Sequence, residues 1–259
     1  MRNEKLISFD LRADFGFFKK PDYNDGILLS YNMLPKPAFL GILGAIAGLG
    51  GYKKKGEWPE YYIALKDILI SIEPLDHEKG NFAKTTLIYT NTVGYANQDG
   101  NLLIEETMLI RPAYRCYLLL DTGEEIQHKL YDQIKNGRAE YIPYLGKNEY
   151  QAWTEENVAE YEFQPYSPQS EFIIKSLFVR KGTIQHKIVS PSFSYTLNSM
   201  TNLGSFCYFE RLPASFDEEL MQYQFNDFAY TDWTLKPDSK IENLFLLKSG
   251  DQEKIIQLY

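Results

Sequence analysis

The sequence predicts an α+β protein in which residues 1–150 alternate between strand and helix and residues 151–259 form a smaller, β-rich domain. Apolar and polar residues alternate over 6–13, as they do in half-buried strands, and 108–121 is expected to be another strand. The composition shifts beyond Trp153, where 164–170 is rich in proline and serine and is expected to be a linker. The first part reads strand, helix, strand, strand, helix, which approaches a ferredoxin-like order.

The first helix is marked by prolines at its start and glycines at its end. Pro37 suits the first helical position, where an N–H has no partner in any case, and Pro35 keeps the preceding chain extended. We expect a helix over 38–49, closed by Gly50-Gly51. It follows a strand at 6–13, a turn at 21–26 and a short extended piece at 27–31.

Three glycines, Gly41, Gly44 and Gly48, recur in this helix at spacings of three and four and share one face. Each costs about 1 kcal/mol in helix propensity relative to alanine. Tight packing of the helix on a sheet would offset that cost, and so would a closely approaching ligand. Packing is the preferred interpretation, because glycines inside helices usually serve it.

A polar excursion over 75–106 follows an expected strand at 61–72. Two strand-like runs, 85–92 and 102–104, flank a turn at 97–100 that holds an Asp-Gly pair. This pattern predicts a hairpin that protrudes from the domain.

The strand at 108–121 is interrupted by Pro112, which has no N–H for a sheet ladder, so an edge or a bulge is expected there. A helix over 122–136 follows, with Asp121 or Thr122 as its cap and Gly137 at its end. Beyond the linker we expect one helical turn at 217–221 and strands at 172–181, 206–212, 225–231 and 244–248.

The charge is distributed unevenly. The chain has a formal net charge of −8, which disfavours a free-standing nucleic-acid binder. Residues 1–55 nevertheless carry nine Lys or Arg against five acids, whereas 149–259 carry nine against 16. A site that grips a phosphate backbone is therefore expected in the first part of the chain.

Two distant cysteines, Cys116 and Cys207, fit no metal-binding spacing and favour a reduced, cytoplasmic protein. The most apolar run, 39–49, is about half of what a membrane-spanning helix needs. No secretion signal precedes the first strand. No cofactor, metal site or membrane partner is expected.

Catalytic motifs are absent from the sequence. His77, His128 and His186 have no paired spacing, and no phosphate-binding or nucleophile-elbow motif occurs. The adjacent acids Glu105-Glu106, Glu124-Glu125 and Glu218-Glu219 are expected on the surface. A general-acid role for His186 in RNA cleavage is the one catalytic possibility to consider, because histidine titrates near neutrality.

Aromatic and basic residues gather around the first helix. Tyr31, Asn32 and Lys36 precede or open it, where a helix N-terminus can hold a phosphate and a ring can stack on a base. The lysines 53–55 at its other end read equally well as a solvated run. Arg111, Tyr114 and Arg115 make a second basic and aromatic group, of uncertain register because of Pro112.

Four segments together resemble one protein family. They are residues 13–20, the glycine-bearing helix with its approach at 30–49, the strand at 111–117 and the loop at 144–149. The chain resembles the CRISPR-associated Cascade subunit that caps the 5′ handle of the guide RNA, which is the fifth Cas family of the RAMP superfamily, and is most similar to its type I-B branch. Residues 209–213 also have a counterpart in that family, although the likeness weakens beyond 150.

The resemblance implies a ferredoxin-like, RRM-like RAMP domain over 1–150, with a protruding β-hairpin thumb at 76–107, and a smaller β-rich domain over 151–259. It implies binding to the crRNA 5′ handle, contact with the Cascade backbone and large subunits, and only indirect contact with target DNA. The RNA-binding residues then expected are Lys19, Lys20, Tyr31, Asn32, Lys36, Lys53, Lys84, Arg111, Tyr114, Arg115, Tyr144, Gly146 and Lys147.

One branch of that family, from type I-C, cleaves precursor RNA with a Lys-His pair after the thumb and a Tyr near the first helix. This chain has Tyr31 but no histidine between His77 and His128, so a non-catalytic subunit is expected. Two alternatives stay open: a metal-independent endoribonuclease that processes precursor crRNA, and a scaffold with no RNA contact.

Overall fold

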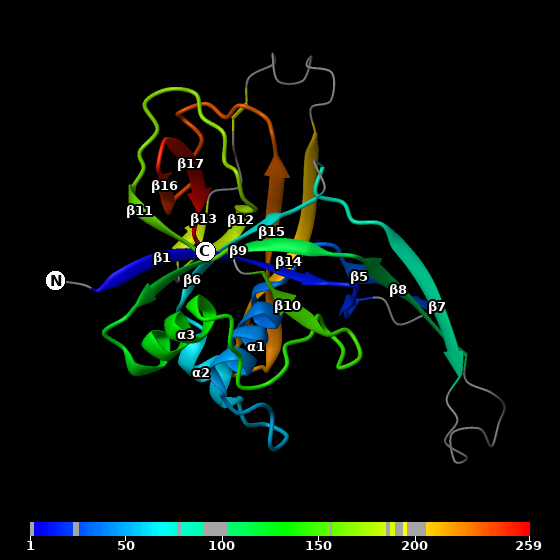
Figure 1. Ribbon diagram of the computed structural model, residues 1–259. Coiled ribbons are helices and arrows are strands. Elements are labelled where there is room, and N and C mark those ends of the chain that lie inside the picture. The colour runs from blue at the N-terminus through cyan, green and yellow to red at the C-terminus, as the bar shows by residue number, and fades with distance from the viewer. Residues whose placement is uncertain are drawn as a thin grey trace.

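The structure, a computed structural model, is a mixed α/β, strand-rich fold with a curled antiparallel sheet (Figure 1). It describes residues 3–22, 26–76, 79–90, 103–155, 157–184, 187–189, 194–195 and 206–259. The largest sheet has seven strands in the order β17-β16-β11-β1-β9-β6, with β10 also paired to β1. Their bounds are β1 Glu4–Ala13, β6 Leu69–Pro74, β9 Ala113–Asp121, β10 Ala152–Thr154, β11 Ala159–Pro165, β16 Leu244–Ser249 and β17 Gln252–Gln257.

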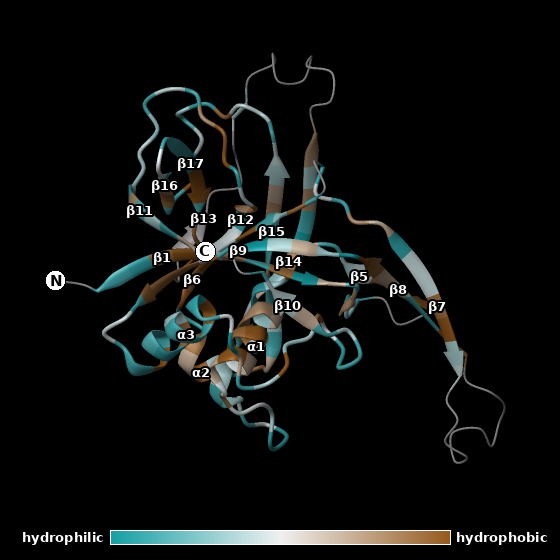
Figure 2. Ribbon diagram, in the orientation of Figure 1, coloured by the Kyte–Doolittle hydropathy of each residue, from teal (hydrophilic) through white to brown (hydrophobic). Residues whose placement is uncertain are grey.

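Three helices cover one face of this sheet (Figure 1): α1 Lys36–Ala47, α2 Glu60–Leu65 and α3 Glu125–Lys135. Alternate residues of β1 and β9, such as Phe9 and Leu118, are fully buried and belong to the same apolar cluster as Phe39 and Leu43 of α1. Hydropathy colouring shows α1 as largely apolar and α3 as largely polar (Figure 2). The first helix is therefore the inner one, and α3 is amphipathic.

The opposite face of the sheet is polar and charged where β1 and β9 meet. Arg115 donates from Nε and Nη2 to the two oxygens of Asp10, at 2.7 and 2.8 Å, and Asn157 donates to Asp10 as well. Burial alone would raise the pKa of Asp10, but these hydrogen bonds and the Arg115 charge outweigh it and lower the pKa. Asp10 is therefore ionised and paired across the physiological range.

Smaller sheets complete the fold. A four-stranded antiparallel sheet has the order β13-β12-β15-β14, from β12 Phe178–Ile184, β13 Lys187–Val189, β14 Cys207–Asp217 and β15 Gln222–Thr231. Another groups β2 Phe15–Gly16, β4 Ile27–Leu28, β7 Lys84–Thr90 and β8 Leu103–Ile110, and a third pairs β3 Phe18–Lys19 with β5 Ser30–Tyr31. The antiparallel pair of β7 and β8 projects from the body in Figure 1. The turn predicted at 97–100 lies outside the described residues.

The two halves of the chain share their core. Strands β11, β16 and β17 of the second half belong to the sheet that β1 begins. Val179, Leu212 and Phe228 join the cluster that holds Leu34 and Phe39. None of the helices in the described residues is long and apolar enough to cross a membrane.

Both long helices were predicted, but several shorter elements were not. The strand predicted at 61–72 is confirmed only over 69–72, where β6 begins. It is wrong over 61–65, because Pro59 starts α2 there and Tyr62 and Leu65 bury one side of that helix. The helical turn predicted at 217–221 is also wrong, since β14 runs to Asp217 and a turn leads into β15. Residues 164–165 of the predicted linker belong to β11.

The interruption expected at Pro112 is a corner between two strands. β8 ends at Ile110, and β9 begins at Ala113 in a different sheet. Between them Arg111 adopts a φ of 48° and donates its N–H to the carbonyl of Asp14 at 2.8 Å. The chain thus turns from the projecting pair into the main sheet over two residues, Arg111 and Pro112.

The helix glycines pack as predicted, but against a helix and not against a sheet. A Cβ on Gly44 would lie 2.5 Å from the Tyr61 Cβ of α2, whereas one on Gly41 would lie 3.9 Å from that ring. Gly48 does not share their role. It follows the helix with a φ of 79° and forms its C-terminal cap.

These distances predict opposite effects for two alanine substitutions. Gly44→Ala should destabilise the protein by about 2 kcal/mol, because the helices must separate to admit the methyl group. Gly41→Ala should be neutral or stabilising by up to about 1 kcal/mol, since its methyl group finds ordinary contact and alanine favours the helix. Urea unfolding of both variants measures the difference, and an equal loss in both would contradict this packing.

Candidate nucleic-acid interface

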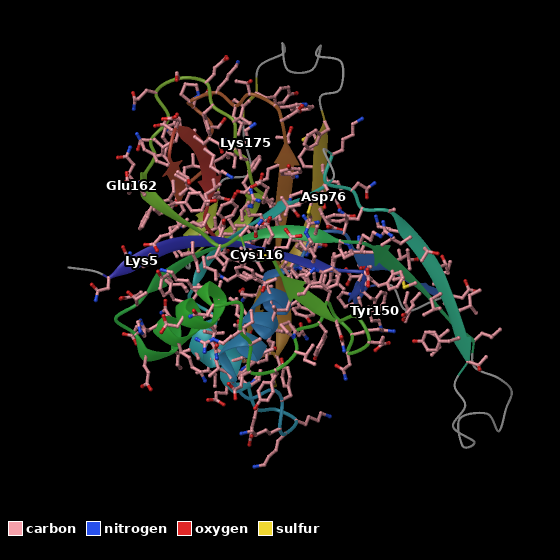
Figure 3. The ribbon with its side chains drawn as sticks, in the orientation of Figure 1. Lys5, Asp76, Cys116, Tyr150, Glu162 and Lys175 are labelled. Carbon is pink, nitrogen blue, oxygen red and sulfur yellow. The ribbon has the colours of Figure 1, made fainter. Side chains whose placement is uncertain are left out.

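Three segments far apart in the sequence meet at the base of the projecting strands. The segment 14–20 runs along β8, where Phe15 pairs with Ile110 and Gly16 with Leu109. The loop 144–150 lies against the same segment, since Phe17 donates its N–H to the carbonyl of Leu145 at 3.0 Å. Tyr150, labelled in Figure 3, holds its ring 6.1 Å from that of Phe15. We call this junction the hairpin base.

Gly146 allows the loop to approach so closely. It has a φ of 88°, and a Cβ there would lie 1.8 Å from the carbonyl oxygen of Phe17. Any side chain would therefore push the two segments apart. The glycine predicted as an RNA contact has a structural role in this position.

The next residue, Lys147, is held by a buried carboxylate. Its Nζ lies 2.6 Å from both oxygens of Glu106, which is fully buried in β8. The hydroxyls of Tyr89 and Tyr150 each lie 3.3 Å from an oxygen of the same carboxylate. Burial alone would lower the pKa of Lys147, but the hydrogen bond and charge of Glu106 outweigh it and raise the pKa. The expectation that Glu106 is solvated is wrong.

A second buried carboxylate, Glu210 of β14, organises the approach to α1. It accepts the main-chain N–H groups of Asn32, at 3.2 Å, and Met33, at 3.0 Å. The Nζ of Lys20 lies 3.3 Å from the same carboxylate and 5.1 Å from the centre of the Tyr31 ring. The second half of the chain thus fixes the segment that precedes the first helix.

Asn32 extends this network to the projecting strands. Its side-chain oxygen accepts the N–H of Phe82 at 2.9 Å and the Nζ of Lys84 at 3.1 Å. Its side-chain amide donates to the carbonyl of Gly80. Its main-chain carbonyl accepts the hydroxyl of Tyr114 at 2.6 Å. Asn32 is therefore the link between Glu210, β9 and the chain that enters β7.

Several residues that we predicted as RNA contacts are buried. Tyr31, Asn32 and Tyr114 have at most 4% of their surface exposed, and so offer almost nothing to a nucleic acid. Arg115 is bound by Asp10 on the polar face of the main sheet. The sequence analysis located the region in which these residues lie, but their side chains are used for contacts within the protein and not for contact with RNA.

Other predicted residues are partly engaged or lie elsewhere. Lys84 donates to Asn32, Asn81 and the carbonyl of Phe82, and burial lowers its pKa. Lys53 lies on the exposed loop between α1 and α2. Lys36 donates to the main-chain oxygen of Tyr259 and lines a separate cleft, so it does not lie at the hairpin base.

Two cations and several rings remain on the surface of the hairpin base. Arg111 bonds to Asp14 at one end of the 14–20 segment, Lys19 lies near the other end, and both side chains are exposed. Phe15 and Tyr89 are more than a third exposed, as is Tyr144. The sequence analysis missed Phe15 and Tyr89 as contact residues, although they lie within the segments 13–20 and 85–92 that it had named.

Exposed cations beside exposed rings suit a flexible polyanion that carries aromatic bases. Among the described residues, no group of three or more His, Cys, Asp or Glu side chains could hold a metal ion. The described part of the site therefore fits binding by charge and stacking.

Comparisons with known proteins give structural likeness only. No protein-family model matches the sequence, and neither does any curated protein. A CRISPR protein from Archaeoglobus fulgidus is 12% identical, covers 98% of this chain and 99% of its own, and superposes with a TM-score of 0.49. A chain of a CRISPR RNA-guided surveillance complex is 10% identical over 88% of this chain and 91% of its own, with a TM-score of 0.48. A chain of a type III-B Cmr-beta complex bound to cognate target RNA is 12% identical over 90% and 86%, with a TM-score of 0.45.

The Glu106–Lys147 pair leads to a stability prediction. Lys147→Met should cost about 3 kcal/mol at pH 8, because it leaves a buried carboxylate without its cation.

The matched control is the double variant Glu106→Gln, Lys147→Met, which removes both charges. It should recover most of the lost stability. Urea unfolding at pH 8 measures the parent and both variants. A single variant as stable as the parent would contradict the pairing of Glu106 with Lys147.

Proposed function

We propose that this protein is a non-catalytic subunit of a type I CRISPR surveillance complex and that it binds the 5′ handle of the crRNA at the hairpin base. The observation that carries the proposal is the exposed set of Lys19, Arg111, Phe15, Tyr89 and Tyr144 around one rigid junction. The segments that form this junction are among those on which the resemblance to the handle-capping Cascade family was based. Charge and stacking suffice for such binding, because the guide itself reads the target by base pairing.

The strand order supports a RAMP domain of the ferredoxin-like, RRM-like type. Strands β1, β6, β9 and β11, with α1 and α3 between them, follow the β-α-β-β-α-β sequence, and they lie side by side as β11-β1-β9-β6. We assign the projecting pair of β7 and β8 as the thumb of this family and the β12–β15 sheet as the core of its smaller domain. The type I-B subtype rests on the sequence resemblance alone.

The thumb strands also suit protein contacts. Ile88 and Leu103 are large, apolar and exposed on one face of the pair, and Leu87 is exposed on the other. Exposed apolar side chains gathered on one face favour contact with a partner. We propose that this face contacts the backbone subunit. Within the assembled complex this protein also contacts the large subunit, and it reaches target DNA only through the complex.

The geometry around Tyr31 disfavours the nuclease alternative. A catalytic tyrosine must reach its substrate, but Tyr31 is only 4% exposed. Burial, together with the charges of Asp22 and Glu210, raises its pKa far above its ordinary value. Tyr31 is thus unsuited to act as a base at neutral pH. His77 and His186 lie outside the described residues.

The proposal predicts a charge-specific loss of RNA binding. In the assembled complex, Lys19→Gln with Arg111→Gln should weaken binding of handle-bearing RNA several-fold. The dependence of log affinity on log salt should become shallower by about 0.7 for each phosphate contact removed. Filter binding across a salt series measures both quantities.

Lys135→Gln is the matched control, since this lysine lies exposed in the last turn of α3 and bonds to Tyr131. It should leave affinity and salt slope unchanged. Complexes that bind the handle equally well with and without the two hairpin-base cations would contradict the proposal. RNA cross-links confined to other subunits would favour the scaffold alternative.

A further inference from the structure

An open cleft of about 890 Å³ lies where the helical layer meets the β12–β15 sheet. Lys36 and the turn between α2 and β6 form one wall. β12, β14 and β15 form the other, with Phe216 and Phe225 among its apolar residues. A cleft of this size falls in the range that binds small organic molecules. The hairpin-base cations Lys19 and Arg111 are not among its lining residues.

The amine of Lys36 is the notable group in this cleft. Lys36 is the first residue of α1, and its Nζ donates to the main-chain oxygen of Tyr259 at 3.0 Å. That oxygen is fixed, because it also accepts the N–H of Ile70 at 3.1 Å. An ammonium group has three donors, so the bond to Tyr259 leaves Lys36 able to bind an incoming acceptor.

The other charged side chains of the cleft differ from Lys36. Lys66 is already paired with Glu218, and Asp67 is exposed. Asn226 exchanges hydrogen bonds with the main chain of Thr183 at 2.8 and 2.9 Å. Of the two lysines among the described lining residues, Lys66 is thus bound to a side-chain carboxylate and Lys36 to a main-chain oxygen.

We propose that this cleft binds a phosphorylated organic molecule of about nucleotide size, with its phosphate on the Lys36 amine. An ammonium group binds phosphate as a point charge, and the described lining of the cleft offers no arginine fork that would select a carboxylate. Thr183, Ser215 and Gln224 supply hydroxyl and amide groups for the remaining oxygens, and the apolar wall suits a ring. This inference does not depend on RNA binding at the hairpin base.

The ionisation of Lys36 agrees with this role. Burial lowers its pKa to about 8, although the charge of Asp67 acts in the opposite direction. The ammonium form, which binds the anion, prevails below that pKa and is lost above it. The groups that face Lys36 are Asp67, the Lys66–Glu218 pair and the rings of Tyr62 and Tyr259. Affinity for a phosphate should therefore fall as the pH rises through 8.

Calorimetric titration of the full-length protein tests the proposal with four probes: AMP, adenosine, and a short RNA with either a 5′-phosphate or a 5′-hydroxyl. We expect AMP or the 5′-phosphorylated RNA to bind, and its partner without the phosphate to bind at least tenfold more weakly. Binding of AMP would identify a free nucleotide as the source of the phosphate, and binding of the 5′-phosphorylated RNA would identify an RNA end. Both results support the site.

Variants of the cleft complete the test. Lys36→Met and the cleft-filling Gln224→Trp should each weaken phosphate binding at least tenfold, whereas Lys135→Met, outside the cleft, should not. Gln224 is exposed, so its substitution should leave the fold intact, which thermal unfolding checks. The proposal is overturned if no phosphate probe binds, or if binding is indifferent to Lys36→Met. Because Lys19 and Arg111 lie outside the cleft, Lys19→Gln with Arg111→Gln should leave AMP affinity unchanged, which separates this test from that of the hairpin base.

Discussion

The buried carboxylate of Glu210 ties the two halves of the chain together. It projects from β14 and accepts two successive main-chain N–H groups, those of Asn32 and Met33, with Lys20 as its cation. A buried carboxylate is stable only when hydrogen bonds and a countercharge replace its lost water. Glu210 meets this condition only if the segment before α1 takes the conformation that presents both N–H groups to it. The position of α1, and of the chain that enters β7, follows from that.

A similar arrangement recurs at the loop 144–150. Glu106 lies in β8, the strand that returns from the projection to the body, and holds Lys147, while Gly146 lets the loop approach Phe17. Two buried carboxylates, one from each half of the chain, thus fix the hairpin base. The cations that they hold are largely neutralised, so the positive surface is left to Lys19 and Arg111. An interface built in this way is rigid before a ligand arrives, which lowers the entropic cost of binding.

The sequence predicted much of the fold and less of the site. Periodicity and capping identified β1, α1 and α3, because these elements depend on local patterns. It failed at α2, where the alternation in 61–72 resembles a strand but Pro59 begins a helix. It also could not show that β11, β16 and β17 extend the main sheet, since pairing between distant strands has no local signal.

The candidate site shows the same division. Tyr31 and Asn32 were identified in one group and Tyr114 in a second, but the conformation of the segment that holds the first two depends on Glu210, which is distant from it in the sequence. Glu106 looked like a surface acid, because nothing near it in sequence reveals Lys147. Phe15 and Tyr89 were missed since single exposed aromatics carry no pattern. Spacing locates a region that matters, whereas the direction of each side chain is set by tertiary contacts.

Amide hydrogen exchange at Asn32 and Met33 tests the role of Glu210 most directly. The Glu210→Leu variant keeps a side chain of similar size but removes the acceptor. Exchange at these two amides should then accelerate at least tenfold relative to the amide of Leu118 in the centre of β9. If their exchange stays in step with that of Leu118, Glu210 does not hold the segment before α1, and the two halves of the chain are joined by other contacts.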